Sequence, residues 1–410
     1  MNTRVRVIAL IQLAVVPFLV LSIFGTQFLG RQLTVGDFFG VCLLLLFVGR
    51  GLMSRVWRLK YFAFIEQVWF ALLVVMLIVA ILNAGMANGT FLNGFRTLLL
   101  SLVAYISGRR LVDNKNYLIR ALIAVYIGFA VILIYVRADI IGKFSEDPTH
   151  LVGYESSVAG VNVTNLNAYG LIWSCLAASA VIFYLKFEKR HLAYLAAVIP
   201  VPFVLFSLSR SAYLMYVVTI CSLAYYAMRY GRKSIIDRAF LLVGAFMFAV
   251  LSYYYFSGLG SRDRISSKFD SFWDELFAQR LGVLMWRPIF EAINSGGLGG
   301  FLLGNFDAPQ HNSIANYFVM FGIFGLLGYL AFILVNFRVG LYNAKARLPR
   351  YISSRDASLL SFSVIFFAVG VFNDLATNLF FYYPPFAYLF FFLIGCARPN
   401  ARGSSQQLVG

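Results

Sequence analysis

The stretch "YFAFIEQVWFALLVVMLIVAIL", residues 61–82, holds one charged side chain, Glu66, in an otherwise apolar run. A helix rises about 1.5 Å per residue, so a run of this length can cross a hydrocarbon core about 30 Å thick. An unbroken apolar run satisfies its backbone inside a membrane as a helix, whereas a barrel strand would alternate apolar and polar residues. The stretch therefore predicts a membrane-spanning helix.

Similar runs recur along the 410 residues, which are 61% hydrophobic and 12% charged. A soluble core cannot hold that much apolar surface. We predict an all-α polytopic membrane protein with about 12 transmembrane helices, forming a single domain over residues 1–400 with a short cytoplasmic tail at 401–410. The predicted spans are 7–24, 35–50, 61–82, 94–109, 117–136, 166–185, 192–208, 211–228, 239–257, 312–335, 357–373 and 378–396.

Basic residues indicate the orientation of the chain, because positively charged loops stay cytoplasmic. With the N-terminus inside, most of the 34 lysine and arginine residues fall in cytoplasmic segments, and both termini are cytoplasmic. The net charge of +17 is then a topology signal, and it needs no nucleic acid partner to explain it. The lipid bilayer is the expected surrounding.

Two outer, periplasmic loops are long, at residues 137–165 and 258–311. Loops of such length in a compact membrane protein are usually functional or disordered. Apolar side chains between Ile265 and Met285 recur every three to four residues, which predicts an amphipathic helix on the membrane surface or over the bundle.

Proline and glycine interrupt the rest of the second loop. Pro288 disfavours a helical conformation in the preceding residue, so we expect a break near Arg287 and a short second helix that begins at Pro288. The stretch "GGLGGFLLG", residues 296–304, predicts a flexible turn. In the span at 312–335, glycines at 322, 325 and 328 predict close packing on a neighbouring helix.

Polar side chains gather at the outer face. Arg210 lies in "SLSRSAY" between two spans, where an arginine is costly unless it is paired, faces water or binds an anion. Each candidate could instead have a purely structural role. A histidine at a helix start can cap the helix, and an arginine can pair with a carboxylate four residues away, as Arg287 could with Glu291. The candidates are Arg210, Arg280, Arg287, His311 and Asp374.

Several features occur in a fixed order between about residues 205 and 335. They are a serine-arginine-serine turn at 209–211, Arg280 six residues before Trp286, the glycine-rich stretch, and His311 with Asn312 opening a span that continues "FGIFGLLGYL". In this order and on this side, the features resemble the bacterial O-antigen ligase and O-antigen polymerase superfamily. The first six spans carry no pattern that matches.

The resemblance implies a glycosyltransferase with a GT-C-like helical bundle in the bacterial inner membrane, active at the periplasmic face. The donor would be a glycan on undecaprenyl diphosphate. The acceptor would be another lipid-linked glycan for a polymerase, or the lipid A core for a ligase. No cofactor and no catalytic metal are expected, and a chain-length regulator protein is a possible partner.

The same resemblance implies roles for the candidate residues. Arg210, Arg280 and His311 would be catalytic, since guanidinium groups bind a diphosphate leaving group well. His311 would either accept the proton of the attacking hydroxyl or hydrogen-bond the diphosphate, and the sequence leaves this open. The expected substrate-binding residues are Arg287, Asn312, Asp374 and Trp286.

Other functions are compatible with the sequence. A transporter or flippase of the same lipid-linked glycan is less favoured, because the chain shows no repeated halves and its polar residues gather at one face. A peptidoglycan-type polymerase is a third alternative. Polymerase is preferred to ligase because nothing specifically marks a lipid A-core site.

Overall fold

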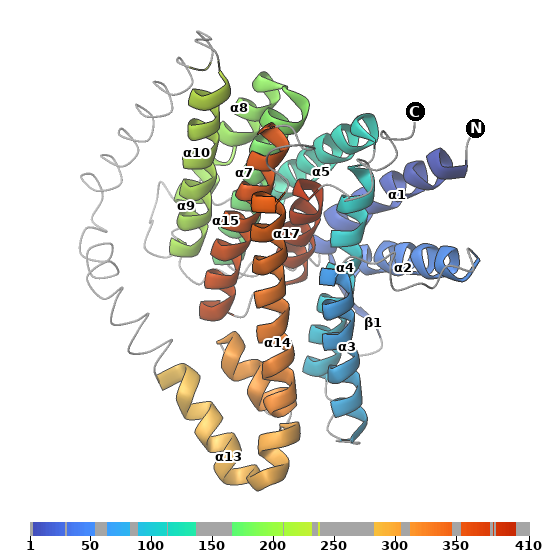
Figure 1. Cartoon of the computed structure of the whole chain (residues 1–410), viewed down its shortest axis with the longest axis vertical. Coiled ribbons are helices and arrows are strands. Elements are labelled where there is room, and N and C mark those ends of the chain that lie inside the picture. Colours follow the sequence, from blue (N-terminus) through green and yellow to red (C-terminus); the bar gives the residue numbers. More distant parts are fainter. Residues whose placement is uncertain are drawn as a thin grey trace.

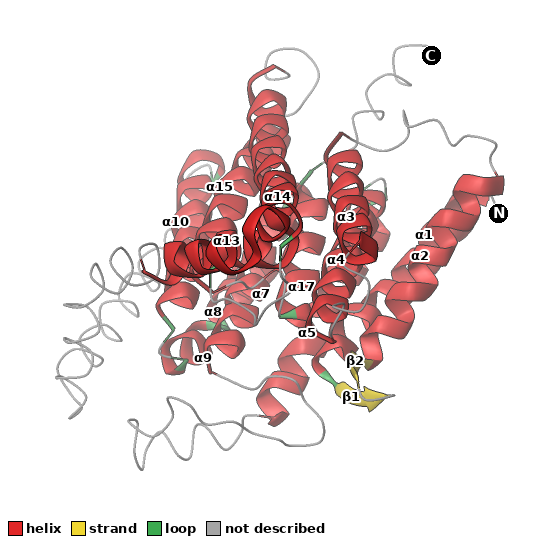
Figure 2. Cartoon of the chain, turned by 90° about the horizontal axis from the view of Figure 1, so that it is seen from below, coloured by secondary structure: helices red, strands yellow, loops and turns green. Residues whose placement is uncertain are grey.

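The computed structural model describes residues 3–28, 31–53, 64–82, 89–112, 114–136, 166–207, 209–231, 237, 283–304, 312–346, 354–377, 380 and 383–398. This part of the chain is almost entirely helical, with one small β-hairpin that the sequence analysis did not anticipate (Figure 2). The prediction of an all-α membrane protein is confirmed at this level. The predicted span at 239–257 and the loop at 137–165 lie outside the described residues.

The helices and strands follow one another in a simple order. They are α1 (Thr3–Val20), η1 (Leu21–Ile23), β1 (Gly25–Phe28), β2 (Arg31–Thr34), α2 (Val35–Met53), α3 (Phe64–Leu82), α4 (Gly89–Leu111), α5 (Lys115–Val136), α7 (Leu166–Phe187), α8 (Arg190–Val198), α9 (Val201–Phe206), α10 (Arg210–Tyr230), α13 (Leu284–Leu303), α14 (Ser313–Ala346), α15 (Ser354–Thr377) and α17 (Pro384–Ala397). Within the described residues, six helices are long and apolar enough to cross a membrane: α3, α5, α7, α10, α14 and α15.

Contacts between helix ends show which helices of the bundle in Figure 1 begin or end at the same side. Lys186, at the end of α7, pairs with Asp356 at the start of α15 at 2.9 Å. The hydroxyl of Tyr230, at the end of α10, donates a hydrogen bond to the Ser354 carbonyl at 2.9 Å. The ends of α7 and α10 therefore meet the start of α15.

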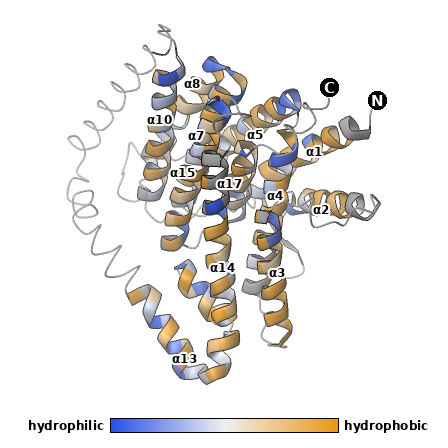
Figure 3. Cartoon of the chain, viewed as in Figure 1, coloured by the Kyte–Doolittle hydropathy of each residue, from blue (hydrophilic) through white to orange (hydrophobic). Residues whose placement is uncertain are grey.

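One end of the bundle collects charged side chains from several helices, and hydrophilic residues colour the helix ends in the upper part of Figure 3. The sequence analysis predicts the basic residues of this end to be cytoplasmic, because they come from alternate connections. We call it the basic end and define it by the residues of four ion pairs: Glu66 with Arg109, Lys186 with Asp356, Arg190 with Asp237, and Glu188 with Arg355.

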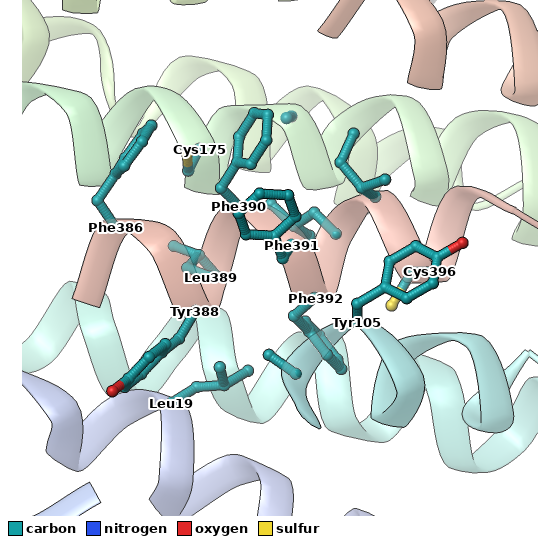
Figure 4. Packing of buried hydrophobic residues seen from close by; sticks show 14 of the residues in the cluster. Leu19, Tyr105, Cys175, Phe386, Tyr388, Leu389, Phe390, Phe391, Phe392 and Cys396 are labelled. Carbon is teal, nitrogen blue, oxygen red and sulfur yellow. The ribbon is translucent and has the colours of Figure 1, made fainter. Parts of the chain in front are cut away.

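Helix α17 lies in the centre of the bundle, and all its residues from Pro385 to Ala397 are buried. Figure 4 shows Phe390 beside Cys175 of α7, whereas Tyr388 points toward Leu19 of α1. Its fourteen residues rise only about 21 Å, less than the thickness of a bilayer core. A helix this short can lie inside a membrane protein because the neighbouring helices, and not lipid, surround it.

The predicted span at 192–208 is divided into α8 and α9 by Pro200, which has no N–H to donate to the carbonyl of Ala196. The hydroxyl of Tyr126, from α5, donates to that carbonyl at 3.1 Å. The hydroxyl of Tyr216, from α10, donates to the next carbonyl, that of Ala197, at 2.7 Å. Neighbouring tyrosines thus satisfy backbone groups beside the proline break, as a membrane interior requires.

Helix α13 corrects two expectations for the second long loop. The helix begins at Leu284 and passes through Pro288, so no second helix begins at the proline. Because proline has no N–H and its ring meets the carbonyl four residues earlier, here that of Leu284, the helix passes Pro288 without one backbone hydrogen bond. The break occurs instead at Gly297 (φ 55°, ψ −144°), and residues 298–303 of the expected turn are helical.

Helix α14 is also interrupted, at Gly322 (φ 64°, ψ −159°). A Cβ atom at Gly322 would lie 2.2 Å from the Leu302 carbonyl oxygen, and one at Gly304 (φ 73°) would lie 2.6 Å from the Met320 carbonyl carbon. The end of α13 and Gly304 after it therefore pass backbone to backbone against the break in α14. Of the glycines expected to pack closely on a neighbouring helix, Gly328 faces Leu72 of α3 and Gly322 lies against the backbone of α13. Gly322 also breaks α14, which was not expected.

Candidate functional site

The start of α10 carries the serine-arginine-serine turn. Ser209 is the N-cap of the helix, and its hydroxyl accepts a hydrogen bond from the Ala212 N–H at 3.3 Å. Capping by serine satisfies one of the orphan N–H groups of the first turn. Arg210 is the first residue of the helix, so its backbone is fixed by this cap, but its side chain lies outside the described part of the structure.

The end of α15 lies against the start of α10. The side-chain amide of Asn373 donates a hydrogen bond to the carbonyl of Ser211 at 3.3 Å. Asn373 is 1% exposed, so this contact is made inside the protein. Two of the segments that the sequence analysis singled out, the one around Arg210 and "FNDLATN", are therefore neighbours.

Asp374 is fully buried at the end of α15 and accepts hydrogen bonds from three directions. Its Oδ2 atom accepts from the Ser313 hydroxyl at 2.8 Å and from the Tyr329 hydroxyl at 2.5 Å. Its Oδ1 atom accepts from the backbone N–H of Phe380 at 2.6 Å, just before α17. We call Asp374, Ser313, Tyr329 and Phe380 the Asp374 cluster.

The Asp374 cluster reveals how sharply α14 is folded. Ser313 and Tyr329 are sixteen residues apart, a separation of about 24 Å along a straight helix. Both hydroxyls nevertheless reach the same carboxylate oxygen, and the rings of Tyr317 and Tyr329 stack with centroids 4.3 Å apart. The first segment of α14, residues 313–321, must therefore lie back along the second segment, residues 323–346.

The fold-back sets the position of the start of α14. Because Tyr329 lies seven residues beyond the break, Ser313 is carried about 10 Å along the second segment. Asn312 is the N-cap residue there, since its side-chain oxygen accepts from the Ala315 N–H at 3.2 Å, and it is 1% exposed. His311 precedes it directly and lies outside the described residues.

The remaining candidates belong to the second long loop. Arg287 lies on α13, exposed, and forms the alternative ion pair with Glu291 at 2.7 Å. This hydrogen bond raises the pKa of the Arg287 guanidinium above its usual value. Trp286 is 51% exposed beside it, so both side chains face outward from the protein. Arg280 and the predicted amphipathic helix up to residue 282 lie outside the described residues.

A second buried carboxylate, Asp37, was missed by the sequence analysis. It forms a reciprocal capping box with Thr34 at the start of α2, pairs with Arg96 of α4 at 3.1 Å, and accepts from the Tyr388 hydroxyl of α17 at 3.0 Å. The spacing Thr-x-x-Asp is a recognisable start signal for a helix. These contacts join three helices, which is a structural role.

Ser313 and Tyr329 were also missed as members of a site. Ser313 follows the His-Asn pair directly, and Tyr329 lies in the quoted stretch "FGIFGLLGYL", but only the fold-back brings them together. In the described part of the chain, no group of three histidine, cysteine or carboxylate side chains is arranged to hold a metal ion.

The site thus joins the starts of α10 and α14 to the end of α15. Three segments that are about 60 to 160 residues apart are connected by hydrogen bonds from Asn373 and to Asp374. The chain matches no model of a known protein family, and no curated protein sequence is significantly similar to it.

Proposed function

We propose that the protein is a bacterial inner-membrane glycosyltransferase that polymerises glycan repeat units carried on undecaprenyl diphosphate, at the periplasmic face. The proposal combines the motif resemblance with one observation. The side chain of Asn373 donates a hydrogen bond to the carbonyl of Ser211, which follows Arg210. The hydroxyl of Ser313, which follows Asn312, donates to the carboxylate of Asp374. These bonds connect three of the segments that the resemblance marks for function.

The proposed reaction forms a glycosidic bond and breaks the bond between the sugar and the diphosphate. The acceptor hydroxyl attacks the anomeric carbon of the donor, and its proton passes to His311. The lipid diphosphate leaves with the bonding electron pair, and its negative charge is stabilised by Arg210 and Arg280. Energy comes from the diphosphate linkage, so the reaction needs neither nucleotide nor metal.

Burial of Asp374 suggests an indirect role for it in this scheme. A carboxylate with no exposed surface does not meet a sugar, and its hydrogen bonds hold helix ends together. Asn312, the N-cap residue beside His311, is also buried, at 1% exposed, so it would orient the histidine and not the sugar. Arg287 and Trp286, exposed on α13, are proposed to contact the glycan, since aromatic side chains stack on sugar rings.

A transfer assay tests the site. Purified protein in lipid nanodiscs receives a short lipid-linked glycan, and longer products are separated on a gel. We expect His311→Ala and Arg210→Ala to lower turnover at least 100-fold, whereas Arg229→Ala, an exposed arginine on the same helix, leaves it unchanged. Full transfer by correctly inserted His311→Ala and Arg210→Ala proteins would contradict the proposed site.

A gene deletion separates polymerase from ligase. Surface lipopolysaccharide whose core carries a single repeat would support a polymerase. Uncapped core, with long glycans remaining on the lipid carrier, would replace the polymerase proposal with the ligase alternative. Unchanged lipopolysaccharide and unchanged lipid-linked glycan would reject both.

A further inference from the structure

The break in α14 requires contacts that hold its two segments at a fixed angle. On one side, Gly322 and the Leu302–Gly304 backbone are so close that a Cβ atom at either glycine would overlap the opposite chain. On the other side, the contacts are polar and aromatic. The side chain of Tyr329 takes part in both of them.

Tyr329 connects the second segment to the first in two ways. Its ring stacks on that of Tyr317, with an interplanar angle of 12°. Its hydroxyl donates to the Asp374 oxygen that also accepts from Ser313, the first residue of the first segment. Asp374 and Tyr329 are each at most 1% exposed, so water does not substitute for a missing contact there.

We infer that Tyr329 is a positioning residue: together with Asp374, it fixes the first segment of α14 and so the place of Asn312 at the start of that segment. The inference rests on the proposed function for its catalytic consequence. The contacts themselves are independent of that function, because they concern only how the two segments are joined. Tyr329 contacts no reacting atom in this scheme.

Rigid placement has a large effect on a group-transfer reaction. Displacing a reacting group by about 1 Å can lower the rate about 100-fold. Loss of the Tyr329 hydroxyl leaves the stack with the Tyr317 ring intact. Tyr329→Phe therefore weakens the contact between the two segments of α14 without creating a cavity. Tyr329→Leu removes both contacts and should weaken it further.

A matched control separates positioning from stability. Tyr226 is also buried on a helix, and its hydroxyl donates to the Ser358 carbonyl of α15 at 2.9 Å. Tyr226→Phe therefore also removes one buried tyrosine hydrogen bond to α15, but near the basic end. Both phenylalanine variants should lower the thermal unfolding temperature, Tyr329→Phe by more, because its hydroxyl donates to a carboxylate.

The first measurement is the distance distribution between two spin labels, in a protein whose exposed Cys42 and Cys221 are replaced by serine. One label replaces Leu298 on α13, which packs on the first segment, and the other replaces Leu334 on the second segment; both positions are exposed. We expect Tyr329→Phe and Ser313→Ala to broaden the distribution and Tyr226→Phe to leave it unchanged. An unchanged distribution in Tyr329→Phe and Ser313→Ala would overturn the inference.

The second measurement is lipid-linked glycan transfer by the same variants. We expect Tyr329→Phe to lower kcat about 10- to 100-fold with little change in KM, and Tyr226→Phe to retain wild-type kcat. Equal losses of kcat in both variants would show a stability effect and overturn the positioning role. If wild-type protein transfers no glycan while Tyr329→Phe still broadens the distribution, the proposed function fails and the structural role of Tyr329 stands.

Discussion

The Asp374 cluster and the basic end hold helices together by different means. At the basic end, Lys186 pairs with Asp356 and Arg355 pairs with Glu188, and the side chains of Asp356 and Glu188 are 30% and 67% exposed. In the Asp374 cluster, a carboxylate with no exposed surface accepts from two hydroxyls and a backbone N–H. Water can replace a partner in these two ion pairs, but it cannot do so in the cluster. The other two pairs of the basic end have buried carboxylates, with the side chains of Glu66 and Asp237 2% and 5% exposed.

This difference determines what each contact contributes. An exposed ion pair stabilises a protein by about 0–1 kcal/mol, because water and salt screen it. A buried donor that loses its acceptor costs about 1–3 kcal/mol. The cluster beside the proposed site should therefore tolerate substitution much less well than the two exposed ion pairs of the basic end.

Removing the central carboxylate should have the largest effect. Asp374→Ala leaves the Tyr329 hydroxyl and the Phe380 N–H without this acceptor, so we expect a loss of roughly 4 kcal/mol in the free energy of unfolding. The Ser313 hydroxyl keeps the backbone carbonyl of residue 374 as an acceptor, at 2.7 Å. Asp356→Ala, which removes a carboxylate at the basic end, should cost at most about 1 kcal/mol. Unfolding in mixed detergent micelles measures both. Equal losses would remove the distinction between the two regions.

The glycine at the break gives the next largest effect. We expect Gly322→Ala to cost about 3–4 kcal/mol, because the backbone conformation strains any side chain and the new Cβ overlaps the Leu302 backbone. Gly297 has a similar conformation, but nothing lies within 4 Å of its Cβ position. Gly297→Ala should therefore show the strain alone, about 1–2 kcal/mol. If the two variants were equally stable, close packing would not be what fixes the break.

The smallest effect is expected at Glu188, in the tight turn between α7 and α8. This residue has a φ of 59°, which is unfavourable for a side-chain-bearing residue. Glu188→Gly relieves that strain while losing the Arg355 ion pair, so we expect a net change within about 1 kcal/mol. Glu188→Gln keeps the strain and loses the charge, and it should be the less stable of the two. The reverse order would show that this exposed pair contributes more than its surroundings suggest.

The fold could be predicted where apolar residues are continuous. The run at 61–82 corresponds to α3, and those at 117–136 and 166–185 correspond to α5 and α7. Interruptions were harder to predict, although Pro200 was visible in the sequence. Gly322 gave no warning, because a glycine in a membrane helix serves close packing as readily as a reversal of the chain.

The candidate site could be predicted only as a set of separate segments. Arg210 was selected because an arginine is costly at a membrane boundary, Asn312 because of the motif resemblance, and Asp374 because it lies among the polar residues of the outer face. The structure brings their neighbours together through Asn373 and Ser313. Tyr329 could not be selected. Its contact with Ser313 through Asp374 depends on the fold-back, and helical periodicity would have placed the two residues far apart.

Helix α7 shows how such a bundle can be made one helix at a time. It is the most enclosed candidate span, with 89% of its apolar window buried, yet synthesis produces it before α10, α14, α15 and α17. Its two buried serines bond within the helix: Ser174 donates to the Gly170 carbonyl at 2.9 Å and Ser179 to the Leu176 carbonyl at 2.6 Å. A newly inserted α7 can therefore remain in lipid with these hydroxyls satisfied until later helices replace the lipid around it. Ser174 then shares its hydrogen with the Ala212 carbonyl of α10, at 2.8 Å.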